Sequence, residues 1–319
     1  DFMGAISKTV TECGGLSEGY TVLQLLPDGK PASEAELSTR GAELRGWRLS
    51  TSSPSLDTES LIGLIKQYHP DILFGTPTRI YRLTQLSKGQ HDLAKLGVRI
   101  LFLSSEYLPE TLRERLQDIW GCEVYRYFGM TEMGFMGGAE CHAHRGFHFN
   151  EMDLLLEVVD PGTGKPVKEG EGELVFTTLK REAMPLIRYK TGDLVELVPG
   201  KCSCGTFLKT IGRRIRRAES THKLGDEEID LTTFDDVLYT VPEVIDYQVA
   251  LTAERGKDKV MVKAVATCKE GVADKISNTI MSIPSIKKNA EAGCMSEPGI
   301  EFVDSIKREG RAKKRLERF

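Results

Sequence analysis

The feature that most constrains the fold is an alternation of buried-strand and amphipathic-helix patterns along the first 121 residues. Short apolar runs at 21–25, 72–75 and 98–103 are bounded by polar or turn residues, as buried strands are. The stretches 58–70 and 109–121 carry apolar residues at helical spacing. Strand, helix, strand and helix in this order predict a parallel α/β sheet.

Local signals place the ends of these helices. Thr58 is the expected N-cap of the first, which should stop at Pro70, and the second runs from Pro109 to Gly121. Residues 2–13 also have helical spacing, so the chain is expected to begin inside or just before a helix, as a fragment would.

The pattern changes in the second half of the chain. From 147 to 198, alternating apolar residues and Gly/Pro turns predict β-hairpins, which would form an antiparallel sheet or a small barrel attached to the α/β layer. After 212 the chain predicts a compact α+β unit. Its expected elements are helices at 230–244 and 270–284 and strands at 246–253 and 259–267.

Composition excludes several classes of protein. Hydrophobic residues at 40% and charged residues at 28% are typical of folded globular proteins. A net charge of −4 argues against a nucleic-acid-binding protein, and no apolar run is long enough to span a membrane. The seven cysteines are scattered and odd in number, which favours reduced thiols and a cytoplasmic location.

The segment 125–134 carries the first candidate site. It follows a predicted strand and places Gly129, Thr131 and Glu132 in a turn. A hydroxyl beside a carboxylate at the carboxyl end of a strand suits a phosphate and its Mg²⁺. From spacing alone, the favoured interpretation is a loop with a capping threonine and a solvated glutamate.

A second candidate is the segment 184–197, where Arg188, Thr191 and Asp193 surround a Thr-Gly-Asp turn. An aspartate held there by neighbouring backbone could accept hydrogen bonds from two vicinal ribose hydroxyls. An ordinary hairpin turn is the alternative.

Together these segments match a known pattern. YFGMTE at 127–132, RYKTGDL at 188–194 and IGRR at 211–214 resemble the adenylate-forming enzymes: acyl-CoA synthetases, luciferases and peptide-synthetase adenylation domains. The sequence between them, with GKCSCG at 200–205, resembles the phenylacetate–CoA ligase branch. The resemblance is strong over 101–214 and weaker over 58–100.

This resemblance implies a fold and residue roles. Residues 1–211 would be the C-terminal part of a large adenylate-forming α/β domain, and residues 212–319 a small α+β lid. Thr131 would contact phosphate, Glu132 would coordinate Mg²⁺, and Asp193 would bind the ribose, with Arg213 near the ribose and hinge. The residues placed beside the nucleotide or acyl group are Ser105, Glu106, Tyr107, Tyr127, Phe128 and Gly129.

The implied reaction has two steps. A carboxylic acid attacks the α-phosphate of ATP to give an acyl-adenylate and pyrophosphate, and a thiol such as coenzyme A then displaces AMP after the lid rotates. Transfer to an amine or a carrier-protein thiol is a rival within the same class. Related enzymes are often dimers, so a homodimer is an option that the sequence leaves open.

Three departures from the family pattern favour a rival of another class, a non-catalytic relative that binds nucleotide or a partner. The glycine-rich phosphate loop is not found in these residues, which is also expected if the chain is a fragment and the loop lies upstream of it. An expected acidic hinge residue is missing from GRRIRR at 212–217. In the C-terminal motif, Arg311 replaces the lysine that serves adenylation, so Lys313 or Lys314 would have to reach the site instead.

A last pattern predicts a metal site. Cys202 and Cys204 lie on a glycine-flanked knuckle, and Cys141 precedes three histidines in 142–148. Three sulfurs and one imidazole suit a closed, structural Zn²⁺ site. We expect His148 as the fourth ligand, with His144 or His142 as alternatives, and buried free thiols if no metal binds.

Overall fold

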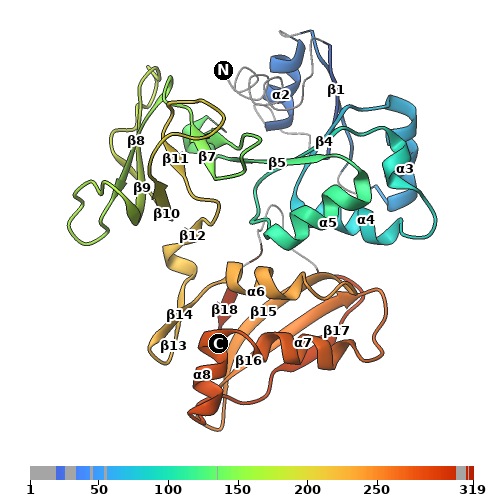
Figure 1. The fold of residues 1–319 in the computed structure, drawn as a ribbon, viewed down its shortest axis with the longest axis vertical. Helices are drawn as coiled ribbons and strands as arrows, with labels where there is room; N and C mark the ends of the chain where they lie inside the picture. Colours follow the sequence, from blue (N-terminus) through green and yellow to red (C-terminus); the bar gives the residue numbers. More distant parts are fainter. Residues whose placement is uncertain are drawn as a thin grey trace. The chain divides into compact units, whose positions relative to one another are not determined.

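The computed structural model describes residues 19–25, 34–43, 46–53, 56–134, 136–306, 314 and 316–319, and Figure 1 shows its course. The chain divides into two compact units. The first contains residues up to Ser105 and Leu116–Ile215, and the second contains Glu106–Arg115 and Arg216–Phe319. The predicted helical pattern at 2–13 lies outside the described residues.

The first unit contains the expected parallel sheet. Its strands follow the order β2-β1-β3-β4-β5, and every neighbouring pair is parallel. The prediction of a parallel α/β layer is therefore confirmed. The strands are β1 (Thr21–Gln24), β2 (Arg48–Thr51), β3 (Ile72–Gly75), β4 (Ile100–Leu103) and β5 (Glu123–Phe128).

Helices and one 3₁₀ turn connect these strands. They are α2 (Glu34–Glu43), α3 (Thr58–Tyr68), α4 (Pro77–Leu86), η1 (Leu93–Leu96) and α5 (Glu110–Trp120). The N-cap expected at Thr58 is wrong by one residue, because the Asp57 carboxylate accepts a hydrogen bond from the Ser60 amide at 2.8 Å. The patterns in the sequence did not predict α2, α4 or β2.

Both faces of the parallel sheet are buried, as its apolar strands require. Side chains of one face, including Phe74 and Phe102, join a single core cluster. Leu73 and Leu101 alternate with them and are fully buried. The Trp120 indole at the end of α5 donates to the Thr84 hydroxyl of α4 at 2.8 Å.

The first unit continues as an antiparallel sheet. Its strand path runs β5-β6-β7-β11-β10-β9-β8, and among the described strands no pairing closes it into a barrel. A second core cluster lies on this part of the unit, with Phe149, Leu174 and Val195 among its buried residues. The strands are β6 (Gly138–Ala139), β7 (Phe147–Phe149), β8 (Leu154–Val159), β9 (Gly170–Thr178), β10 (Tyr189–Val198) and β11 (Thr210–Ile211).

A buried ion pair stands where the sheet changes from parallel to antiparallel. Glu140, just after β6, is fully buried and accepts hydrogen bonds from the Arg126 amide at 3.0 Å and from its Nε at 2.9 Å. Burial would raise the pKa of Glu140, but the His144 ring and the Arg126 charge hold that pKa below its usual value. The pair links β5 to the segment after β6.

The second unit is the α+β fold expected after residue 212. Its sheet has the order β17-β16-β15-β18, and β15 and β16 form an antiparallel hairpin. The strands are β12 (Arg216–Arg217), β13 (His222–Leu224), β14 (Glu227–Ile229), β15 (Val244–Glu254), β16 (Lys257–Ala266), β17 (Gly299–Phe302) and β18 (Leu316–Arg318). The helical segments are η3 (Ala218–Ser220), α6 (Leu231–Leu238), α7 (Val272–Met281) and α8 (Pro284–Glu291). None of the helices described in either unit has the length and apolar character needed to cross a bilayer.

The buried parallel sheet makes a stability prediction. Leu101→Ala in β4 should lower the free energy of unfolding by about 2–5 kcal/mol, because it opens a cavity among fully buried side chains. Leu155→Ala in β8 is the matched control, since that side chain is 47% exposed and its truncation should cost less than about 0.5 kcal/mol. Urea unfolding monitored by tryptophan fluorescence would measure both, and equal costs would contradict this view of the core.

Candidate functional site

The turn that carries Thr131 and Glu132 lies at the carboxyl end of the parallel sheet. It follows β5 as a short 3₁₀ segment, η2 (Thr131–Met133), and the Gly134 amide donates to the Thr131 carbonyl at 3.0 Å. Thr131 is not the cap of this turn, because Met130 holds that position. Thr131 is exposed and Glu132 is half-exposed. Among the described residues neither side chain has a hydrogen-bond or ionic partner, so both are available to a ligand.

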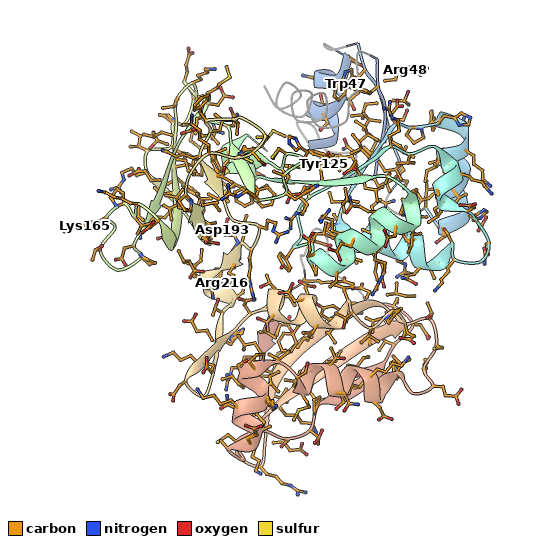
Figure 2. The ribbon with its side chains drawn as sticks, in the orientation of Figure 1. Trp47, Arg48, Tyr125, Lys165, Asp193 and Arg216 are labelled. Carbon is orange, nitrogen blue, oxygen red and sulfur yellow. The ribbon has the colours of Figure 1, made fainter. Side chains whose placement is uncertain are left out.

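Asp193 lies in a bulge within one strand. The sequence predicts a Thr-Gly-Asp turn, but the structure places all three residues inside β10, between Lys190 and Leu194, where the register with β9 shifts. Gly192 has a φ of 72°, which favours glycine. The Thr191 hydroxyl accepts from the Asp193 amide at 3.0 Å and donates to the Leu174 carbonyl at 2.9 Å. This bulge sets the direction of the Asp193 side chain, which is 3% exposed and is labelled in Figure 2.

The two motifs rest on one hydrophobic core. Met133, one residue after Glu132, and Val195, two residues after Asp193, belong to the same buried cluster. Met130 and Tyr189 pack against that cluster as partly buried neighbours. Both segments therefore pack against the same hydrophobic core, although they are about sixty residues apart in the sequence.

The expected nucleotide-bordering residues fall in different surroundings. Ser105 follows β4 at the carboxyl edge of the sheet, with a φ of 71° that is uncommon for a side-chain-bearing residue. Its hydroxyl lies 3.3 Å from that of Ser104. Glu106 and Tyr107 are counted with the second unit, and the Tyr107 hydroxyl donates to Asp236 at 2.8 Å.

Tyr127 and Phe128 pack in the interior more than the sequence suggests. Tyr127 is 6% exposed, and its ring centroid lies 5.5 Å from those of both Phe74 and Phe102. Phe128 is half-buried against Phe147. The Tyr127 ring is thus a core side chain of the parallel sheet.

The remaining expected site residues divide into exposed and undescribed ones. Gly129 is half-exposed at the end of β5, and Arg213 is exposed just after β11. Arg311 and Lys313 lie outside the described residues.

A small pocket opens beside the Thr131–Glu132 turn. It encloses about 190 Å³. The Lys180 ammonium and the Asp153 carboxylate at this pocket lie 2.9 Å apart. Met133 and Met136 are both buried, and both line this pocket. The lining residues are Met133, Gly134, Met136, Asn150, Asp153, Leu154, Thr178, Lys180 and Arg181.

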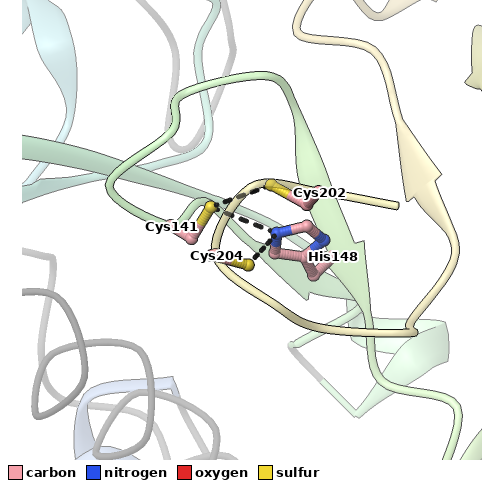
Figure 3. Close-up of side chains that lie close together, drawn as sticks. All are labelled: Cys141, His148, Cys202 and Cys204. Carbon is pink, nitrogen blue, oxygen red and sulfur yellow. Dashed lines mark hydrogen bonds between the residues drawn. The ribbon is translucent and has the colours of Figure 1, made fainter. Parts of the chain in front are cut away.

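Four potential metal ligands converge in the first unit, as Figure 3 shows. The ligand atoms of Cys141, His148, Cys202 and Cys204 all lie within 4.8 Å of one another. The His148 Nε2 is 3.2 Å from the Cys141 sulfur and 3.4 Å from the Cys204 sulfur, and the sulfurs of Cys141 and Cys202 are 3.6 Å apart. Cys141 lies between β6 and β7, and His148 lies in β7. Cys202 and Cys204 lie in the loop between β10 and β11.

The geometry distinguishes the three neighbouring histidines. His148 faces the sulfurs, whereas the His144 ring stacks on Tyr125 and its Nδ1 lies 3.7 Å from Glu140. His142 is exposed and is not among the converging side chains.

The electrostatics of the cluster suit a cation. Burial, together with the neighbouring thiols of Cys202 and Cys204, raises the pKa of the Cys141 thiol to about 12. A bound cation would reverse this by stabilising the thiolates. Burial, with the nearby Arg145 charge, lowers the pKa of His148, so the ring is neutral at pH 7 as a metal ligand must be.

The second unit contains a charged cluster that the sequence did not predict. The Lys314 ammonium lies 3.5 Å from Asp246 and 3.8 Å from Asp235, and it donates to the Tyr239 hydroxyl. It also stands 4.2 Å from the Tyr247 ring centroid. Lys314 is 6% exposed, and its ammonium group is paired with carboxylates of the same unit. The prediction that it could reach a catalytic site is therefore wrong. Local spacing carries no signal for such a cluster, because Lys314 is far in the sequence from the residues of α6 and β15 that surround it.

Comparisons with known proteins agree with this fold. The sequence profile of the AMP-binding enzyme family matches residues 8–179, and the chain belongs to that family. It is 33% identical over 228 residues to the phenylacetate-coenzyme A ligase of Thermus thermophilus, covering 70% of this chain and 51% of that protein. It is 36% identical over 165 residues to the phenylacetate-coenzyme A ligase of Aromatoleum evansii, covering 50% of this chain and 37% of that protein. The chain thus spans about half or less of the length of these two relatives.

A solved structure shows the same fold. A 2-hydroxyisobutyryl-CoA ligase in complex with its acyl-adenylate superposes with a TM-score of 0.79 at 20% identity, covering 98% of this chain and 68% of that one. The resemblance to adenylate-forming enzymes of the phenylacetate–CoA ligase type is therefore confirmed.

The Lys314 cluster makes a prediction about stability and pH. Lys314→Met should cost about 3–5 kcal/mol, because it leaves two buried carboxylates without their cation. Burial raises the pKa of Asp235 from 3.8 to about 6, while Lys314 opposes that rise. This group's contribution to stability is therefore full below about pH 4 and is lost as pH rises through about 6.

Without Lys314 the pKa of Asp235 rises further, so the deficit of the variant should be larger at pH 8 than at pH 5. Thermal unfolding at both pH values would measure this difference. Lys287→Met in α8 is the control, since that side chain is exposed and should change stability little at either pH. A deficit that does not depend on pH would contradict the proposed charge balance.

Proposed function

We propose that the protein containing this chain is an AMP-forming acid–thiol ligase that activates a carboxylic acid with ATP and transfers the acyl group to coenzyme A. The observation that carries this proposal is the pair of unpartnered Thr131 and Glu132 side chains at the carboxyl edge of the parallel sheet, supported by the same core as the Asp193 bulge. Membership of the AMP-binding enzyme family and the names of the relatives support the reaction type.

The proposed nucleotide-binding residues form two groups, one at the phosphates and one at the ribose and base. Thr131 would donate its hydroxyl to a phosphate oxygen, and Glu132 would hold Mg²⁺, which when bound neutralises phosphate charge. Asp193 would accept hydrogen bonds from the two ribose hydroxyls. Gly129 would let the backbone approach the nucleotide closely, and Ser105 would border the base from the end of β4.

The remaining assignments concern the second unit and its surroundings. Glu106 and Tyr107 would also border the base, and Arg213 would lie near the ribose. Residues 212–319 would act as the lid, with Arg311 or Lys313 supplying positive charge during adenylation. We place the reaction in the cytoplasm, as cysteine usage suggests.

Both chemical steps are displacements. A carboxylate oxygen attacks the α-phosphorus of ATP, and pyrophosphate leaves with the electron pair of the broken P–O bond. The sulfur of coenzyme A then attacks the acyl carbon and AMP leaves, while the thiol proton passes to solvent. The residues of this chain would contribute by positioning the nucleotide and by hydrogen bonding to its charged groups.

Carboxylate-dependent exchange of pyrophosphate into ATP tests the first step in the gene product that contains this chain. Glu132→Gln and Asp193→Asn should each slow the exchange about a hundredfold or more, because each removes one interaction with the bound nucleotide. Glu169→Gln, at an exposed position before β9, should exchange like the wild type. No exchange by the folded wild type with any member of a broad acid panel would contradict catalysis and favour a non-catalytic nucleotide-binding relative.

We also propose that Cys141, His148, Cys202 and Cys204 bind one structural Zn²⁺. Three thiolates and one neutral imidazole match the closed tetrahedral sites that zinc prefers. The bound ion would join the segment around β7 to the loop between β10 and β11, and it would leave no open position for catalysis.

Metal analysis of the purified protein should find about one equivalent of zinc per chain. Cys202→Ser should lower that content and reduce thermal stability, because one thiolate ligand is lost. Cys268→Ser is the matched control, since Cys268 is an exposed free thiol outside the cluster. A zinc content that is the same in both variants would refute the assignment.

A further inference from the structure

His148 makes contacts through both of its ring nitrogens. Its Nε2 faces the sulfurs of Cys141 and Cys204, and its Nδ1 lies 2.9 Å from the Thr210 hydroxyl oxygen. Figure 3 shows the second nitrogen directed away from the sulfurs. A neutral imidazole carries one proton, so the partner of one nitrogen determines which nitrogen is free to bind a metal.

The sheet register brings Thr210 to this position. β11 pairs with β7 in antiparallel register, and Thr210 lies directly opposite His148. The approach is close, because a Cβ on Gly146 would come within 2.0 Å of the Ile211 carbonyl oxygen. Glycine at 146 therefore permits the two short strands to lie together. Thr210 is 4% exposed, so water does not compete freely for its hydroxyl.

The second contact of Thr210 leaves its oxygen able to accept from the ring, because its hydroxyl can donate to the Leu208 carbonyl at 3.5 Å. A metal ion bound at Nε2 would use the Nε2 lone pair, so the single proton of the neutral ring would then be on Nδ1. A lone pair of the Thr210 oxygen, 2.9 Å away, would accept that proton. The Nε2 lone pair is then directed at the thiols.

We propose that Thr210 is a positioning residue for the metal site: it holds His148 in the tautomer protonated on Nδ1 and so presents Nε2 to Zn²⁺. This inference rests on the proposed zinc site. Thr210 touches no metal itself; it fixes the orientation and tautomer of a ligand before the ion binds. Such partners of ligating histidines change metal affinity by about 10- to 100-fold when they are removed.

The test compares zinc affinity among threonine variants by competition with a chromogenic chelator. Thr210→Val keeps the shape of the side chain but removes the acceptor, and it should weaken binding about 10- to 100-fold. Thr210→Ser keeps the hydroxyl and should restore near wild-type affinity. Thr206→Val is the matched control, because that hydroxyl lies in the same loop and accepts from the Leu208 amide at 3.3 Å without contacting His148.

Long-range ¹H–¹⁵N correlation spectra of the imidazole give a second readout that does not depend on the stability of a variant. Zinc-loaded wild type should show His148 protonated on Nδ1 and bound through Nε2. Binding through Nδ1, or equal zinc affinity for the wild type and Thr210→Val, would overturn the role of Thr210 while leaving the zinc site intact. If the wild type binds no zinc, the proposed metal site fails, and the inference about Thr210 fails with it.

Discussion

The buried pair of Arg126 and Glu140 is the interaction on which the arrangement of the first unit depends. It lies where β5, the last strand of the parallel sheet, pairs with β6, the first strand of the antiparallel part. Both side chains are almost fully buried, at 4% and 0% exposure. Removing one partner of such a pair leaves an uncompensated charge in the interior, which costs about 3–5 kcal/mol.

Two candidate sites begin at this junction. The β5–β6 pairing closes the base of the loop that carries Thr131 and Glu132, because Phe128 pairs with Gly138. Glu140 is followed directly by Cys141, the first of the converging metal ligands. A structural ion bound by these ligands would therefore hold the chain immediately beyond the loop of the nucleotide-binding proposal. The buried pair and the first of the converging side chains, Cys141, are thus adjacent in the chain, directly after β6.

The second unit contains a buried charge cluster of another composition than the Arg126–Glu140 pair. Lys314 brings a single ammonium to two carboxylates and two aromatic rings, and this cluster fastens the end of the chain to the hairpin of β15 and β16. Cation–π contacts and hydrogen bonds offset part of the cost of burying these charges.

The sequence by itself determined the alternation of strands and helices in the first unit (although not α2, α4 or β2), the change from a parallel to an antiparallel sheet, and the residue types of both candidate sites. These follow from hydrophobic periodicity, turn residues and short motifs, which are properties of neighbouring residues. Only the tertiary structure decided that His148 and not His144 faces the thiols, that Thr-Gly-Asp is a bulge inside β10, and that Lys314 is buried. The reason is physical: each of these outcomes depends on strand register or on contacts between distant segments, and local conformational preference carries no information about either.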